Sequence, residues 1–315
     1  MKEKAIICKG LTKQFGDFRA VDSISFDVEQ GEIFGFLGAN GAGKTTSIRM
    51  ITYITTPDEG RVLFQGKPVG TWSQDRMGYM PEERGLYKKM KIGEQLIFMA
   101  ELKGLSPSEA RKQVRYWLER FGASDWANKK TEELSKGMQQ KVQFISTIAH
   151  NPDLIILDEP FSGLDPVNAE LLREVILELK NIGKTILFAS HRMEQVEQMC
   201  DDICLIAHGK AVLTGSLREI KRSFGRNTVE VEFEGSDEWI TQAGGLHGIS
   251  VKARTRNRAE LVIAQEAQAQ KILQMAIGAG VAIIRYELME PSLNEIFIRT
   301  VASDTPPSTS NFVAS

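Results

Sequence analysis

The stretch GANGAGKT, residues 38–45, follows the apolar segment EIFGFLG and leads into a helical pattern that begins at about Lys44. It matches G-x-x-x-x-G-K-[ST], the phosphate loop, in the strand-to-helix context that this motif requires. The glycines allow backbone N–H groups to close on phosphates, Lys44 supplies a positive charge, and the Thr45 hydroxyl can ligate Mg²⁺. The stretch therefore predicts a nucleoside triphosphate site at the start of an α/β core.

A pair of acids downstream suits the same chemistry. LIILDEP, residues 154–160, reads as a buried apolar strand that ends in Asp158 and Glu159. Neighbouring side chains of a strand point in opposite directions, so one carboxylate can hold the metal while the other polarises the attacking water. We assign Asp158 to the metal and Glu159 to the general base. The alternative for two such acids is a solvated turn.

The composition limits the class of protein. A length of 315 residues favours two domains, and a net charge of -2 gives no basic field of the kind that nucleic acid attracts. Three cysteines are too few for a disulfide framework, and Cys200 and Cys204 lack the further ligands of a zinc site. The longest weakly apolar run, residues 275–284, is too short to cross a bilayer, so we expect a soluble chain whose membrane association comes through a partner.

The order of patterns predicts an α/β domain with a helical insertion. Strand patterns cover residues 4–15 and 23–32, and a helical region extends over about 82–150. Within it, Ser106 and Glu109 form a capping box for the helix of residues 106–122. The apolar strands DLIILDEP and KTILFASH are typical of a parallel sheet that is covered on both faces. CLIAHGKAVLTG then predicts a closing hairpin, and KRSFGRNT, residues 221–228, a linker.

After the linker the pattern predicts a small α+β domain. Its elements follow the order β-α-β-β-α-β, the ferredoxin-like order. They are expected over 228–235, 237–242, 248–255, 259–264, 265–278 and 281–287. The predicted domains are therefore 1–224 and 228–301, and the Ser/Thr/Pro-rich end of the chain, 303–315, is expected to be disordered.

Taken together, GANGAGKTT, LSKGMQQK, LIILDEP, SGLD and His191 resemble the ATP-binding subunit of an ABC transporter, over about residues 4–220. The resemblance implies ATP and Mg²⁺ as cofactors and a dimer in which the signature LSKGMQQK of one subunit closes on ATP held by the other. Ser135 and Gly137 would contact the γ-phosphate there, at a helix N-terminus where partial positive charge collects. By itself, LSKGMQQK would read as a plain helix cap. The phosphate-loop residues that the resemblance assigns to ATP are Asn40, Gly41, Gly43, Lys44, Thr45 and Thr46.

Four further residues gain roles from the resemblance. His191 matches the switch histidine that contacts the γ-phosphate, and Asp165 matches the aspartate at the dimer interface, where it would also cap a helix. Phe15 falls where related proteins stack an aromatic ring on adenine, with a core phenylalanine as the alternative. Glu82 stands where the family usually has glutamine, and we expect it to keep a role as metal ligand.

The segment PEERGLY, at 81–87, and EPSLNEIFI, at 290–298, resemble a subgroup of bacterial export-type ATPases that includes sodium-extrusion and drug-resistance exporters. The resemblance implies an ATPase on the cytoplasmic face of the cell membrane, acting as a homodimer or with a related subunit. Its polytopic permease would contact about residues 82–100, chiefly Arg84 to Met99.

Two alternatives stay open. One is a soluble ABC-type ATPase that acts on the ribosome or nucleic acid, although the chain has one cassette and no sustained heptads. The other concerns the C-terminal domain, which could bind a small regulatory ligand. We favour a dimerisation or bracing module for it.

Overall fold

The computed structural model describes residues 3–83 and 85–303. The chain divides after Ser216 into two compact units, each described below by itself. The domain limits 1–224 and 228–301 remain predictions. Apart from Ser303, which ends a helix, the predicted tail 303–315 lies outside the described residues, as does Arg84. Within the described ranges, no helix is both long and apolar enough to cross a membrane.

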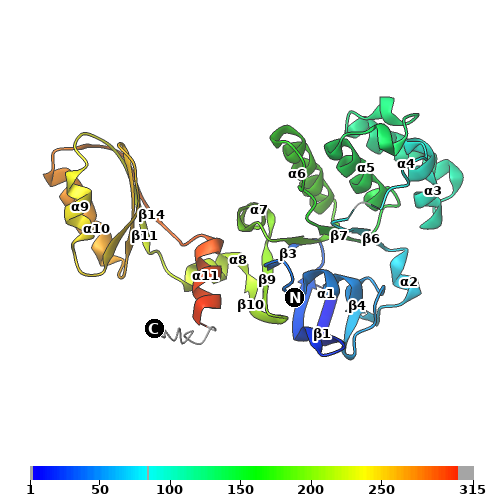
Figure 1. The fold of residues 1–315 in the computed structure, drawn as a ribbon, viewed down its shortest axis with the longest axis horizontal. Helices are drawn as coiled ribbons and strands as arrows, with labels where there is room; N and C mark the ends of the chain where they lie inside the picture. Colours follow the sequence, from blue (N-terminus) through cyan, green and yellow to red (C-terminus); the bar gives the residue numbers. More distant parts are fainter. Residues whose placement is uncertain (1–2, 84, 304–315) are drawn as a thin grey trace, which may run out of the picture. The chain divides into compact units, whose positions relative to one another are not determined.

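The first unit is built on a six-stranded sheet in the order β10-β9-β3-β8-β7-β6 (Figure 1). Its strands pair in parallel, except for the antiparallel pair β9–β10, so the predicted parallel strands and closing hairpin are confirmed. β3, β7 and β8 are buried along their whole length, because α1 (Lys44–Ile51) and a second sheet pack in one core with them and α7 (Met193–Met199) also contacts β3 and β8. The strands are β3 (Ile33–Gly38), β6 (Met77–Met80), β7 (Leu154–Asp158), β8 (Thr185–Ser190), β9 (Asp202–Ala207) and β10 (Lys210–Ser216).

A second sheet, antiparallel and in the order β2-β1-β4-β5, packs in the same unit. Apolar side chains of both sheets and of α1 (Lys44–Ile51) form one core. β1 has the predicted limits, whereas the next strand begins at Phe18 and not at 23, because Phe18 pairs with Phe15 across a tight hairpin. The strands are β1 (Lys4–Phe15), β2 (Phe18–Glu29), β4 (Glu59–Phe64) and β5 (Lys67–Pro68).

Helices form most of the region between β6 and β7, as predicted. The Ser106 hydroxyl accepts a hydrogen bond from the Glu109 N–H, and the Glu109 carboxylate accepts one from the Ser106 N–H, which confirms the capping box. α5 packs against β6 and against α3 and α4. The remaining helices of the unit are α2 (Thr71–Gln74), α3 (Ile92–Leu102), α4 (Pro107–Arg120), α5 (Lys136–Ile148), α6 (Pro166–Asn181) and α7 (Met193–Met199), with 3₁₀ turns at Ser124–Trp126 and Thr131–Glu133.

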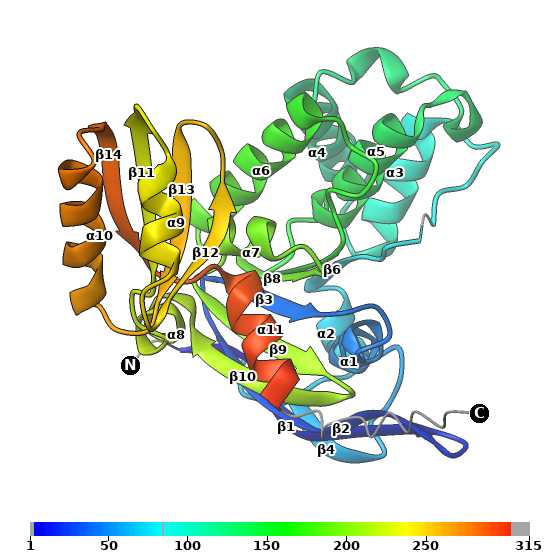
Figure 2. The same cartoon turned by 60° about the vertical axis from the view of Figure 1, so that its left-hand side comes forward.

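The second unit contains the predicted β-α-β-β-α-β succession. Its antiparallel sheet has the order β12-β13-β11-β14, the ferredoxin-like arrangement, and Figure 2 shows these strands side by side. α9 and α10 cover one face, where Phe233 and Trp239 pack edge to face in the core. The elements are β11 (Thr228–Glu234), α9 (Glu238–Gly244), β12 (Ile249–Arg254), β13 (Arg258–Ile263), α10 (Ala267–Gly278) and β14 (Ala282–Met289).

Two helices of this unit differ from the sequence-based expectation. The predicted linker 221–228 is wrong over its first three residues, because they belong to α8 (Leu217–Ser223). The segment EPSLNEIFI, for which the sequence predicts no element, contributes to α11 (Leu293–Ser303). Leu217 and Ile220 of α8 are buried, as are Leu293 and Ile296 of α11, so both helices owe their formation to tertiary packing of apolar side chains.

Candidate nucleotide site

A cavity of about 260 Å³ lies where β3 leads into α1. Four parts of the chain meet there: the start of β2, the phosphate loop, the end of β7 and the segment after β6. The grouping follows from topology, because parallel strands place their carboxyl ends along one edge of the sheet. The residues that line the cavity are Phe18, Ala20, Asn40, Gly41, Gly43, Lys44, Thr45, Thr46, Glu82, Asp158 and Glu159.

The phosphate loop has the backbone that an anion cradle needs. Gly41 and Gly43 adopt left-handed φ values of 78° and 108°, and a Cβ atom on Gly43 would lie 2.5 Å from the Ala20 carbonyl oxygen. The Lys44 Nζ donates hydrogen bonds to the carbonyls of Gly38 (2.7 Å) and Ala39 (3.1 Å). Burial lowers the pKa of Lys44, while the nearby carboxylates oppose that shift. The loop therefore suits a bound polyphosphate.

A second cluster offers oxygen ligands to a cation. The Thr45 hydroxyl donates to the Asp158 carboxylate over 3.1 Å, and Asp158 is almost fully buried. Burial raises the pKa of Asp158 to about 6, and the charges of Glu159 and Glu82 add to the rise. Hydroxyl and carboxylate oxygens are the ligands that Mg²⁺ prefers, and the excess negative charge calls for a cation. The residues present thus fit the implied metal.

Glu159 occupies an unusual position directly after β7. Its φ of 50° is left-handed, which is uncommon for a residue with a side chain. The carboxylate accepts hydrogen bonds from the Ser190 hydroxyl (3.0 Å) and the His191 N–H (2.7 Å), and it lies 2.6 Å from the His191 Nδ1. The structure therefore brings together two predicted site residues and adds Ser190, which sequence reasoning missed. The available signal was its place at the end of β8, which pairs with β7.

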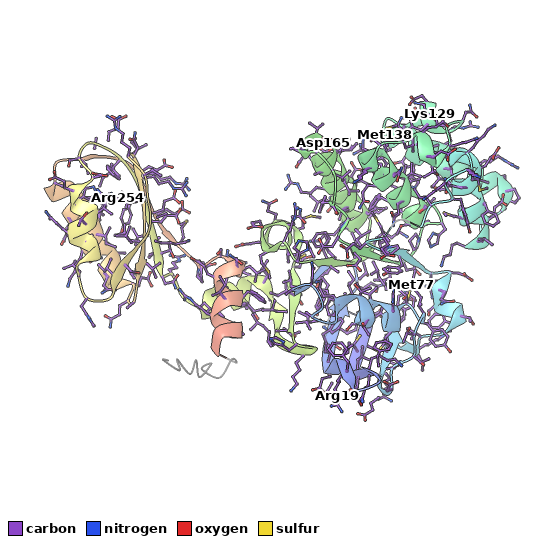
Figure 3. All side chains as sticks on the ribbon, in the orientation of Figure 1. Arg19, Met77, Lys129, Met138, Asp165 and Arg254 are labelled. Carbon is purple, nitrogen blue, oxygen red and sulfur yellow. The ribbon has the colours of Figure 1, made fainter. Side chains whose placement is uncertain are left out.

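Ser135, Gly137 and Asp165 do not line this cavity in the described part of the chain. Ser135 caps α5 by accepting a hydrogen bond from the Met138 N–H, and Asp165 caps α6 by accepting one from the Asn168 N–H, which lowers the pKa of Asp165. Gly137 lies against residues 163–164, just before α6. Figure 3 accordingly shows Met138 and Asp165 at the same end of these two helices. The signature residues and the phosphate-loop cavity thus lie apart on one chain.

The aromatic ring that lines the cavity is Phe18, whereas Phe15 does not line it. Phe15 and Phe18 are direct partners across the β1–β2 hairpin, and both are more than half exposed. The alternative of a core phenylalanine is therefore wrong for Phe15. The contact of Phe15 with adenine stays a prediction. Only two residues separate Phe15 from Phe18, a spacing typical of a tight hairpin, and this was the signal in the sequence that Phe18 lies opposite Phe15.

A phosphate loop, a Thr45–Asp158 pair and an adjacent buried carboxylate are the features of a P-loop nucleoside triphosphatase site. The family model "ABC transporter" matches residues 21–162, and the model "ATP-binding protein DrrA1-3-like, C-terminal domain" matches residues 215–301. The chain is 50% identical over 293 residues to the ABC transporter ATP-binding protein YhaQ of Bacillus subtilis, covering 93% of this chain and 97% of that one. The chain belongs to the ATP-binding proteins of ABC transporters, which are ATPases coupled to transport.

Two further similarities support the assignment. The Nod factor export ATP-binding protein I of Rhizobium sp. (strain N33) is 31% identical over 304 residues, covering 95% of this chain and 97% of that one. A solved structure of an ATP-binding subunit of an ABC transporter superposes with a TM-score of 0.66 at 30% identity, covering 70% of this chain and 93% of that chain. The predicted fold class is thereby confirmed.

Proposed function

We propose that this chain is the ATP-hydrolysing subunit of an exporter, in which two ATPase subunits close head to tail over ATP and drive a separate membrane protein. The observation that carries the proposal is the constellation of Lys44, Thr45, Asp158 and Glu159 around one cavity. A second chain would complete it with Ser135 and Gly137, which lie outside the cavity of their own chain.

Each residue has a role that its surroundings support. Lys44 and the loop N–H groups would bind the β- and γ-phosphates. Thr45 and Asp158, together with Glu82, would hold Mg²⁺, which when bound neutralises charge that develops on the phosphate oxygens. Glu159 would take a proton from the attacking water. His191, next to Glu159, would hold that carboxylate and contact the γ-phosphate.

The head-to-tail closure can be tested by light scattering. A Glu159→Gln variant that binds ATP without hydrolysing it should form a dimer when ATP and Mg²⁺ are added. Adding Gly137→Asp should keep the protein monomeric, because a carboxylate would face the γ-phosphate across the interface. As a control, Ser108→Asp also adds an acid, at the second position of α4 as Gly137 is of α5, outside the cavity. A Gly137→Asp form that still dimerises with ATP would contradict the proposed interface.

We infer that the permease contacts residues 82–100. The helix of this segment exposes Phe98, Tyr87 precedes it, and Leu102 follows at its end, all more than 40% exposed. A cavity of about 250 Å³ lies beside them, lined by Leu86, Met99 and Leu102 among others. An exposed apolar patch next to a cavity suits an apolar helix of a partner. Export as the direction of transport is supported by the name of the Nod factor export relative.

Affinity purification from gently solubilised native membranes tests the partner. We expect a stoichiometric polytopic membrane protein, which would also place the chain at the cytoplasmic face of the membrane. Phe98→Glu should release it, whereas Tyr116→Glu, which changes another exposed aromatic residue outside 82–100, should not. Recovery of ribosomes or nucleic acid without a membrane protein would instead support the soluble ATPase.

A further inference from the structure

Two buried glutamines of α5 reach toward the loops that carry the acids of the site. The Gln140 Nε2 donates a hydrogen bond to the Pro160 carbonyl over 2.9 Å, next to Glu159. The Gln143 Nε2 donates to the carbonyls of Pro81 (2.8 Å) and Glu83 (3.3 Å), which flank Glu82. Spaced three residues apart, Gln140 and Gln143 lie on the same face of the helix. One helix is thus bonded to both acid-bearing segments.

The topology explains how one helix face can reach both segments. β6 and β7 are adjacent parallel strands, with Met80 paired to Leu157, so the residues that follow them leave the same edge of the sheet. α5 packs against β6. Its first turn carries Ser135 and Gly137, which are proposed to meet the ATP of the partner subunit. α5 therefore connects the signature to the edge at which Glu82 and Glu159 lie.

The chemistry of Gln143 argues for more than space filling. The side chain is 4% exposed, and its Oε1 atom has no hydrogen-bond partner within the described residues. A buried amide oxygen without a partner destabilises a fold, and a methionine of similar length would fill the same space without that penalty. The favourable part of the amide is its nitrogen, which holds the Pro81 and Glu83 carbonyls. The hydrogen bonds of Gln143 to the Pro81 and Glu83 carbonyls thus explain why this position is a glutamine.

We propose that Gln143 is a positioning residue for Glu82. By fixing the carbonyls on both sides of residue 82, it sets the place of the Glu82 carboxylate in the cavity that also holds Asp158. Gln140 positions Glu159 in the same way through Pro160. The inference rests on the role proposed above for Glu82. It implies that a displacement of α5 at the signature end reaches the acids of the same chain.

The test is a double-mutant cycle between Gln143 and Glu82. Gln143→Met should lower kcat for ATP hydrolysis about tenfold while leaving the Kd for ATP within about twofold, because the cradle of Lys44 is untouched. In a Glu82→Ala background, itself slower than the wild type, Gln143→Met should have no further effect. Gln140→Met should instead slow both backgrounds by the same factor, since it acts through Glu159.

The control matches the geometry of the change. The Gln74 Nε2 also donates to two neighbouring carbonyls, those of Thr52 and Tyr53, outside the site. Gln74→Met should keep the wild-type kcat. If Gln143→Met does not fold, Gln143→Asn serves in its place, because its shorter amide cannot reach the two carbonyls.

The outcomes separate this inference from the proposed function. A wild-type protein without ATPase activity would contradict the proposed function itself. An active protein in which Gln143→Met keeps the wild-type kcat, or slows the Glu82→Ala variant by the same factor as the wild type, would overturn the positioning role. A Glu82→Ala variant as fast as the wild type would overturn it too.

Discussion

Asp158 and Glu230 are both buried carboxylates, one in each unit, with 1% and 4% exposure. Their partners differ. Asp158 accepts a hydrogen bond from Thr45 but has the acids Glu159 and Glu82 nearby, and the pKa of its carboxyl rises to about 6. Glu230 forms an ion pair with Arg258 at 2.5 Å. Burial alone therefore does not show whether an acid is structural or functional, whereas the charge of its neighbours does.

The same contrast holds for the two sheets. In the first unit, the polar site residues gather at the carboxyl edge of the parallel sheet and fit a cation and phosphates. In the second, charged residues lie along the strands and pair with one another, as Glu260 does with Arg258 (2.9 Å) and Lys252 (3.2 Å). The dimerisation or bracing role of this domain stays a prediction.

The largest expected effect concerns the functional acids. Glu159→Gln should lower the rate of ATP hydrolysis by about 10³-fold, because an amide cannot accept the proton of the attacking water. ATP binding should persist, since the phosphate-loop cradle is unchanged. Steady-state ATPase assays with equilibrium nucleotide binding measure both quantities. Rapid turnover by this variant would refute the assignment of Glu159 as the base. Glu159 would then not count among the functional acids.

The next prediction tests whether Asp158 is destabilising without a cation. Its folded pKa of about 6 lies above the unfolded value near 3.8, so its contribution to stability falls as pH rises between about 4 and 6. With EDTA and without nucleotide, Asp158→Asn should raise the free energy of unfolding by about 3 kcal/mol above pH 6, from two pH units at ~1.4 kcal/mol each. The gain should vanish near pH 4, and urea denaturation at both pH values measures it. If Asp158→Asn were less stable than the wild type above pH 6, the claim that the charged Asp158 carboxylate destabilises the fold would be wrong.

The matched change in the second unit should lower stability instead of raising it, and by a smaller amount. Glu230→Gln removes the charge that faces Arg258 and should lower the Tm by about 2 to 4 °C. The effect is modest because Arg258 is half exposed and water can replace the lost carboxylate. Differential scanning calorimetry measures the change. A Tm above that of the wild type would show that the charge of Glu230 destabilises the fold, as is expected for Asp158.

The smallest effect is expected at Glu82. Glu82→Gln should leave ATP hydrolysis within about tenfold of the wild type, because the amide oxygen can still ligate Mg²⁺. The Mg²⁺ dependence of the ATPase rate should be measured for the wild type and the variant. The variant lacks one of the three acids, Glu82, Asp158 and Glu159, that line the cavity. Complete loss of activity would contradict the proposed role of Glu82 as a metal ligand.

Local signals explain why much of the site could be predicted. The phosphate loop, the capping box at Ser106 and the apolar run before Asp158 depend on neighbours within a few residues, so the sequence carries them directly. The ferredoxin-like order of the second unit follows from successive periodicities of the same kind. Register places Glu159 beside His191, because the parallel strands that precede these two residues end together.

Contacts between distant side chains could not be predicted in this way. Gln143 is 60 residues or more from the carbonyls that it holds, and nothing in KVQF indicates that the amide faces a loop and not solvent. Phe18 lines the cavity because a hairpin brings it there, and α8 forms because Leu217 and Ile220 find apolar contacts. Each outcome depends on tertiary packing, which overrides local preference.

The left-handed backbone at Glu159 has an evolutionary consequence. A left-handed residue with a side chain costs roughly 1 to 2 kcal/mol, and glycine would relieve that cost. Glycine would also remove the acceptor of the Ser190 hydroxyl and the His191 N–H, which is a loss of similar size. Stability alone therefore does not decide between glutamate and glycine, whereas selection for turnover does. In a lineage whose copy of this chain had ceased to hydrolyse ATP, residue 159 should drift early, toward residues that tolerate a left-handed backbone.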